Sequence, residues 1–169
     1  MPAMARFEDL RSSLWDPGNR HGVRPPLTGR LIAEAERALR VTLPGSLLDL
    51  LRHQNGGVVA AEWDAFPTSR PTSWSADHVP FETVMGIGRR EEALSMLDSP
   101  YLVGEWGLPT PVALISGGGP CSIALDYRVR GPREEPSVTW FDAELGEELL
   151  LAPDFRTFVE GLASSADFA

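Results

Sequence analysis

The fold is decided by residues 26–59, which read PLTGRLIAEAERALRVTLPGSLLDLLRHQNGGVV. Apolar side chains recur there at three- and four-residue intervals in two runs, one that includes Ile32 and Leu39 and one that includes Leu47 and Leu51. Such intervals place apolar side chains on one side of a helix. The stretch therefore predicts two short amphipathic helices in series.

Three short motifs mark the ends of these two helices. Thr28 is placed to cap the first helix, because its hydroxyl can accept a hydrogen bond from a free amide of the first turn. Leu43-Pro44 ends that helix and begins the second, since proline is tolerated in a first turn. Asn55-Gly56-Gly57 ends the second helix, because asparagine and glycine accept a left-handed conformation. The residues predict a helix–corner–helix–stop unit.

The chain of 169 residues has the length of one domain. Its hydrophobic fraction of 43% is enough for a core, and 23% charged residues is typical of a soluble protein. No apolar run is long enough to span a bilayer, and residues 1–15 lack the apolar centre of a secretory signal. Cys121 is the only cysteine, so it cannot form an internal disulfide. These features favour a cytoplasmic protein.

The rest of the chain alternates regular segments with turns rich in Pro, Gly and Ser. From hydrophobic spacing we predict helices at 5–15, 89–98 and 153–162, strands at 58–63, 81–87, 112–116, 121–128 and 137–142, and loops at 16–26, 65–79 and 99–108. Helices come first, then a run of strands, then a helix. This order favours an α+β fold over an alternating parallel sheet.

The details of these motifs resemble a known family. Glu34 and Glu36, followed by the Leu43-Pro44 corner and Asn55-Gly56-Gly57, resemble the N-terminal signature of the SUKH superfamily. The superfamily includes the fungal Smi/Knr regulators of cell-wall synthesis and many bacterial immunity proteins. The resemblance continues in order through Leu108-Pro109, residues 112–116, Gly117-Gly118-Gly119, residues 123–127, residues 136–142 and residues 154–159.

The resemblance covers residues 26–162 and implies a domain division. Residues 1–25 would form an N-terminal helix and connector, residues 26–163 the SUKH (Smi/Knr-like) domain, and residues 164–169 a frayed tail. The implied fold is a single α+β domain. It has a mostly antiparallel, twisted sheet with helices packed on one side and a C-terminal helix.

No motif for catalysis or metal binding stands out in the sequence. His21, His53 and His78 have no second ligand at a metal-binding spacing. Cys121 lies in a predicted strand, where packing explains it. There is no Gly-x-Ser-x-Gly elbow, and the triple glycine at 117–119 lacks the Gly-Lys-Ser/Thr of a phosphate loop. We therefore predict no catalytic residue, no metal and no cofactor, and a non-enzymatic protein.

The formal net charge of −9 is unevenly distributed, with +2 in residues 1–60 and −11 in residues 61–169. Such an acidic part repels nucleic acid and attracts a basic protein, mainly by raising the association rate. Acidity also keeps a protein soluble, and charge alone does not separate the two explanations.

Aromatic and acidic residues in predicted loops and strands supply a candidate binding surface. Trp74 and Trp106 lie in predicted loops, and aromatic residues are enriched in binding hot spots. They could equally cap the core from outside. With the acidic residues near these loops, the predicted partner-binding residues are Trp74, Glu82, Glu105, Trp106, Asp126, Glu134 and Glu135.

The resemblance implies a bacterial immunity protein that binds and neutralises a cognate toxin. Many such toxins are nucleases with basic clefts, so an acidic surface could mimic nucleic acid and exclude the substrate. We expect a monomer or weak homodimer that binds a basic toxin domain, with no direct contact to nucleic acid and none to a membrane. A regulatory scaffold with an endogenous partner is the alternative. An enzyme with an unrecognised site is the third hypothesis.

Overall fold

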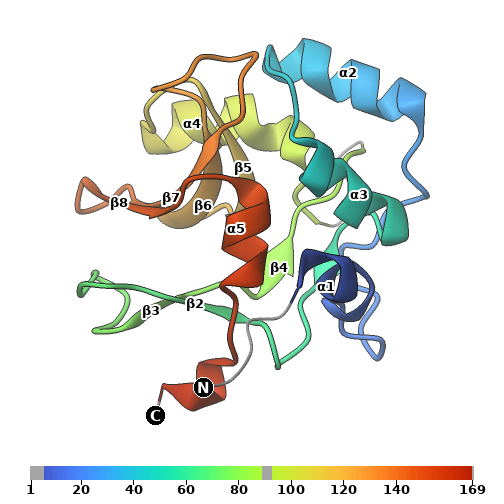
Figure 1. The fold of residues 1–169 in the computed structure, drawn as a ribbon. Helices are drawn as coiled ribbons and strands as arrows, with labels where there is room; N and C mark the ends of the chain where they lie inside the picture. Colours follow the sequence, from blue (N-terminus) through green and yellow to red (C-terminus); the bar gives the residue numbers. More distant parts are fainter. Residues whose placement is uncertain (1–5, 89–92, 169) are drawn as a thin grey trace.

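A computed structural model describes residues 6–88 and 93–168 and confirms the predicted α+β fold (Figure 1). The α-helices are α1 (Phe7–Ser13), α2 (Gly29–Leu39), α3 (Gly45–His53), α4 (Ser99–Trp106) and α5 (Phe155–Glu160). The strands are β1 (Gly57–Val58), β2 (Ala65–Pro67), β3 (His78–Pro80), β4 (Thr83–Val84), β5 (Val112–Gly117), β6 (Cys121–Asp126), β7 (Ser137–Asp142) and β8 (Glu147–Ala152). Within the described ranges, none of the helices combines the length and apolarity needed to cross a bilayer.

The predicted helix–corner–helix unit is confirmed as α2 and α3. The Thr28 hydroxyl caps α2 by accepting from the Leu31 N–H (3.2 Å). In the corner, the Leu43 N–H donates to the Glu36 carboxylate (2.8 Å), which explains one acidic residue of the signature. Pro44 lies one residue before the first turn of α3, as its N-cap, and not inside that turn as we predicted.

Asn55 joins the end of α3 to two distant segments. Its side chain is buried, and its amide donates to the carbonyls of Pro25 and Ile87 (both 2.9 Å). Its side-chain oxygen accepts from the Ile87 N–H (2.8 Å). Gly86 packs directly against this residue, since a Cβ at that position would lie 2.3 Å from the Asn55 carbonyl oxygen. The predicted helix stop therefore also holds the connector before α2 against the segment after β4.

The main sheet has the antiparallel order β5-β6-β7-β8, with Ile123 of β6 opposite Trp140 of β7. α5 lies over β7 and β8, and α1 and α3 pack against α5 (Figure 1). Phe158 of α5 stacks on Phe66 with ring centroids 4.8 Å apart and meets the edge of Phe81 at 5.0 Å. α5 therefore joins the main sheet to the β2–β3 hairpin in one core.

Two predicted loops contain regular structure. Residues 65–79, predicted as a loop, hold the paired strands β2 and β3, with Phe66 opposite Val79. Residues 99–108, also predicted as a loop, hold α4. In α4, Pro100 is in the first turn and Gly107 ends the helix with φ of 66°. Pro100 and Gly107 therefore mark the start and the end of a short helix, and the predicted loop is wrong for this segment.

Other predicted elements are shorter than expected. The strands predicted at 58–63 and 81–87 reduce to β1 and β4, which pair with each other, and the strand predicted at 121–128 ends at Asp126. The predicted helix at 89–98 includes residues 89–92, which lie outside the described residues. Its end is a 3-10 turn at Met96–Asp98 with a Ser95 capping box.

The tail after α5 is held in place, which differs from the predicted frayed end. The N–H of Ala65 donates to the carbonyl of Ala163, and the N–H of Ala163 donates back to Ala65 (both 2.9 Å). A 3-10 turn follows at Ser165–Asp167, where the Ser165 N–H donates to the Asp64 carboxylate (2.8 Å). These bonds fix the tail against the β2–β3 hairpin.

Candidate functional site

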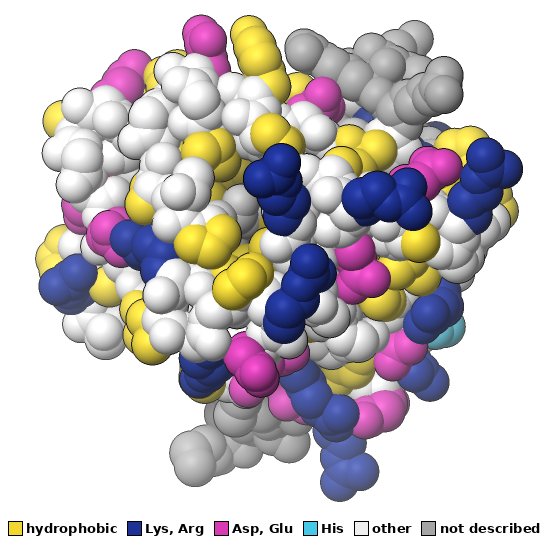
Figure 2. Space-filling model, turned by 90° about the horizontal axis from the view of Figure 1, so that it is seen from above, with side chains coloured by type: hydrophobic (Ala, Val, Ile, Leu, Met, Phe, Trp, Pro, Cys, Tyr) yellow, Lys and Arg dark blue, Asp and Glu magenta, His cyan; other side chains and the backbone are white. Residues whose placement is uncertain are grey.

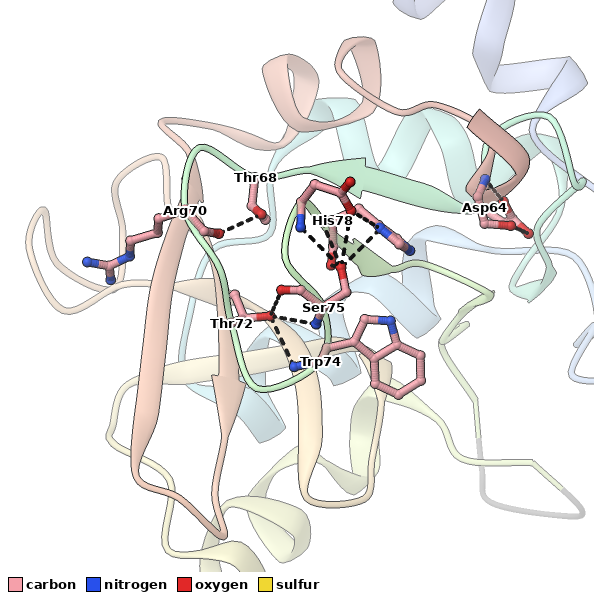
Figure 3. Close-up of polar contacts among 9 residues, drawn as sticks. Asp64, Thr68, Arg70, Thr72, Trp74, Ser75 and His78 are labelled. Atoms are coloured by element: carbon pink, nitrogen blue, oxygen red, sulfur yellow. Dashed lines mark hydrogen bonds and ion pairs between the residues drawn. The ribbon is translucent and has the colours of Figure 1, made fainter. Parts of the chain in front are cut away.

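The connection between β2 and β3, residues 68–77, forms an ordered projection that we call the Trp74 loop (Figure 3). A backbone N–H···O bond of 2.8 Å joins its first and last residues. At the tip, the Thr72 N–H donates to the Ser75 carbonyl (2.9 Å). The Thr72 hydroxyl accepts from the N–H groups of Trp74 (3.1 Å) and Ser75 (3.4 Å). These bonds fix a turn with Trp74 at its tip.

Side-chain hydroxyls hold the rest of the loop. The Thr68 hydroxyl donates to the Arg70 carbonyl (2.8 Å), and the Ser75 hydroxyl accepts from the N–H groups of Asp77 (3.2 Å) and His78 (3.1 Å). Ser and Thr side chains often satisfy backbone groups in this way where no regular structure does so. The crowding of Ser and Thr in this stretch is therefore the source of its order.

The Trp74 loop is also attached to the main sheet. The Ser73 hydroxyl donates to the Asp142 carboxylate (2.5 Å), and the Ser73 N–H donates to the Glu147 carboxylate (3.2 Å). The Arg70 guanidinium donates to the Glu148 carbonyl (3.3 Å). The loop therefore lies against the β7–β8 turn, and both project on the left of Figure 1.

Trp74 is displayed to solvent by this arrangement. Its side chain is 51% exposed, and its indole lies beside the hydrogen-bonded turns, not within them (Figure 3). In the adjacent β7–β8 turn, Leu145 is 70% exposed and its N–H donates to Asp142 (3.2 Å). The "Trp74 surface" is the set Trp74, Glu144, Leu145 and Glu147.

Asp142 carries a full negative charge beneath this surface at neutral pH. The Ser73 hydroxyl lowers the pKa of its carboxyl, burial opposes that effect, and the N–H groups of Leu145 and Glu144 add to it. The carboxylate is therefore stabilised in its ionised form by the same bonds that position the loop and the turn.

We expect Ser73→Ala to release the Trp74 loop and to raise the pKa of Asp142 toward the ordinary value of about 3.9. Because the folded pKa is depressed, the stabilisation is present at neutral pH and is lost as pH falls through that pKa. An NMR titration of the Asp142 carboxyl and hydrogen exchange of the Trp74 amide measure both effects. Ser69→Ala, at an exposed serine of the same loop, is the control. Unchanged exchange at Trp74 in Ser73→Ala would contradict the attachment.

Trp106, predicted in a loop, is the last residue of α4 and is half-buried. Its indole N–H donates to the Gly118 carbonyl (3.1 Å) and so joins the helix to the β5–β6 turn. Glu105 beside it is exposed. Glu82 is also exposed and lines a pocket near the same turn. These residues, with Trp74, lie toward the end of the main sheet where β6 begins.

Asp126 lies at the other end of β6 and is only 6% exposed. Its carboxylate accepts two hydrogen bonds from the Arg128 guanidinium (2.9 and 2.8 Å), one from the Arg128 N–H (3.1 Å) and one from the Thr139 hydroxyl (2.9 Å). Burial alone would raise the pKa of Asp126, but the bonds from Arg128 and Thr139 outweigh burial and lower it. Because its charge is paired internally, we leave Asp126 out of the proposed surface.

Glu134 and Glu135 lie in the β6–β7 connection, also far from Trp74, and both are exposed. The same connection carries Arg128, Arg130 and Arg133. The face seen from above, where α2 and this connection lie, carries Arg side chains interspersed with acidic ones (Figure 2). The charge at this end is therefore mixed, not purely acidic.

The predicted site residues consequently do not form one patch. β6 is six residues long, so its two ends lie roughly 17 Å apart. Trp74, Glu82, Glu105 and Trp106 lie toward one end of the sheet, and Asp126, Glu134 and Glu135 toward the other. Five residues that hold or form the Trp74 surface were not among the predicted site residues: Ser73, Asp142, Glu144, Leu145 and Glu147. The one sequence signal for them is a leucine, Leu145, within an acidic turn.

Among the described residues, no group of three or more His, Cys, Asp and Glu side chains is placed to hold a metal ion. No curated protein matches the chain. Residues 26–161 match the profile of the SMI1 / KNR4 family (SUKH-1).

Proposed function

Because the chain belongs to the SMI1 / KNR4 family (SUKH-1), whose domains generally bind proteins, we propose that it is a non-enzymatic immunity protein. In this proposal it binds a basic toxin domain through the Trp74 surface and blocks the toxin's active site. The cytoplasm is where such a protein would meet its target.

The observation that carries the proposal is the half-exposed Trp74 on a loop fixed by hydrogen bonds. Tryptophan is highly buried on average in folded proteins, and it is enriched in interface hot spots. A side chain on an already ordered loop loses little conformational freedom on binding. The Trp74 surface therefore has the properties of a preorganised anchor.

Acidic residues next to the anchor indicate the partner's charge. Glu144 in the β7–β8 turn and Glu147 at the start of β8 lie on either side of Leu145 in sequence, and Asp142 is ionised beneath them. The chain as a whole carries a formal charge of −9. Carboxylates around an aromatic anchor steer a basic surface into place and accelerate association. A nuclease with a basic cleft would be excluded from its substrate by such contact.

The groups with shifted pKa values support a binding role more than a catalytic one. Asp126 is paired with Arg128, and Asp142 is bonded to Ser73. The buried Tyr127 hydroxyl, whose pKa is raised mainly by burial, donates to the Thr42 carbonyl (2.8 Å). Each of these three groups therefore has a structural partner that accounts for its place in the fold.

The test first searches the reading frames beside this gene for a toxin-like domain, which is then purified in an inactive form. We expect Glu144→Arg to lower the association rate constant about three- to tenfold at low salt, because a rim charge mainly affects steering. Stopped-flow kinetics at several salt concentrations measures this. Glu134→Arg, at the opposite end of the sheet, is the matched control.

Equal rates for Glu144→Arg and wild type, or an equal loss with Glu134→Arg, would contradict binding through the Trp74 surface. If the adjacent toxin-like domain does not bind and a wall-synthesis or housekeeping protein does, the regulatory-scaffold hypothesis replaces immunity.

A further inference from the structure

A pocket of about 260 Å³ opens between the β3–β4 segment and the β5–β6 turn, at the same end of the sheet as Trp74. Its lining includes Glu82, Thr83, Ser116, Cys121 and Trp140. The volume is below the roughly 300–1,000 Å³ typical of small-molecule sites. The pocket therefore suits a single side chain better than a cofactor.

The charge of this pocket differs from that of the neighbouring depressions. Among the residues that the structure describes, its lining includes Glu82 and neither Arg nor Lys. In the depression beside β8, the carboxylates face Arg128 and Arg130, and the cleft at the connector before α2 is lined by Arg20 and Arg24. Of these three depressions, the one at Glu82 has an acid in its lining and, within residues 6–88 and 93–168, no Arg or Lys beside it.

Carboxylates outside the lining add to the negative potential. The pKa of the Cys121 thiol is raised first by burial and then by the charges of Asp142, Glu144 and Glu147. These charges therefore act within the pocket that Cys121 lines. The three residues lie in the β7–β8 turn or at the strand ends beside it, next to the Trp74 loop, so the pocket and the Trp74 surface share one electrostatic field.

The pocket wall also contains a polar group without a bonding partner. Ser122 lines the pocket and is 3% exposed, and its hydroxyl has no hydrogen-bond partner within the part of the chain that the structure describes. Buried hydroxyls are usually paired, because leaving one unpaired costs free energy. This wall is therefore polar as well as acidic.

We propose that this pocket receives an arginine side chain of the protein partner, with its guanidinium on the Glu82 carboxylate. The inference rests on the proposed protein-binding function and names the residue that the partner inserts. Arginine fits better than lysine, because its planar guanidinium can bind a carboxylate through two hydrogen bonds and stacks on apolar or aromatic surfaces.

The test uses small probes, so it does not depend on identifying the partner. N-acetyl-arginine amide is titrated into the ¹⁵N-labelled protein at low ionic strength, with N-acetyl-citrulline amide as the uncharged control of nearly equal shape. We expect saturable shifts at the amides of Thr83, Gly117 and Ser122 with the arginine probe, with a dissociation constant on the order of millimolar. The citrulline probe should give shifts at least fivefold weaker.

Glu82→Gln should weaken binding of the arginine probe at least fivefold. Glu105→Gln, at another exposed glutamate, should leave the affinity for the probe unchanged. Three outcomes would overturn the inference. They are equal shifts with the citrulline probe, no saturable shift with the arginine probe up to about 100 mM, which is far above the expected dissociation constant, and full binding of the arginine probe to Glu82→Gln. If the arginine probe does not bind but the toxin binds in a Trp74-dependent way, only this inference is wrong. If the arginine probe binds but no toxin does, only the proposed function is wrong.

Discussion

Gly86→Ala is expected to lower the free energy of unfolding by about 3 kcal/mol or more, combining overpacking of a tight site with loss of a buried hydrogen bond. A Cβ at this position would lie 2.3 Å from the Asn55 carbonyl oxygen and 2.8 Å from its side-chain oxygen. These neighbours cannot move freely, because Asn55 is bonded to Pro25 and Ile87. For a chain of this size the unfolding midpoint should fall by about 6–12 °C.

Urea denaturation with linear extrapolation measures the change. Gly104→Ala is the matched control, since Gly104 lies within α4 and a Cβ there would meet nothing within 4 Å. We expect this control to raise the free energy of unfolding by roughly 0.5–1 kcal/mol, because alanine is favoured over glycine in a helix. If Gly86→Ala proved as stable as wild type, Asn55 would not be the rigid link described above.

Trp74→Ala is expected to weaken partner binding by at least about 2 kcal/mol, or roughly 30-fold, which is the range of interface hot spots. The loss should appear mainly as faster dissociation, because removing an apolar anchor does not alter the charges that steer association. Folding stability should change little, since the indole is 51% exposed and its loop is held by other groups.

Isothermal titration calorimetry and thermal unfolding separate the two effects. Tyr101→Ala is the control, because Tyr101 is 60% exposed on α4, which contacts β5 at the opposite edge of the main sheet from β8. Wild-type affinity in Trp74→Ala, together with a lower unfolding temperature, would show that Trp74 caps the core from outside. That was the alternative left open by the sequence.

The sequence predicted elements whose signals are local. α2 and α3 have apolar residues at helical spacing, and the β5–β6 hairpin has its glycine turn between two apolar runs. β2 and β3 were missed because each is three residues long and each ends in a proline. β2 is also bridged through Ala65 to the distant Ala163, and spacing along the chain does not show such a contact.

The candidate site was predictable only in part, for a similar reason. Trp74 could be selected because a large aromatic residue in a Ser- and Pro-rich loop is unusual. The bond that attaches the loop, from Ser73 to Asp142, spans 69 positions of sequence and leaves no local pattern. Asp126 was selected for its charge, but the bidentate bond from Arg128 and its burial appear only when β6 and the following turn are built.

The way the Trp74 loop is held has a consequence for how recognition could diversify. Thr72, Ser73 and Ser75 hold the loop through hydroxyls and backbone groups, and the indole contributes none of the bonds at the tip. Position 74 can therefore be exchanged for another side chain while its support remains intact. A library at this one codon would vary the partner that is recognised and leave the melting temperature nearly constant. Under the proposed function, the scaffold thus separates the residue that selects a partner from those that maintain the protein's shape.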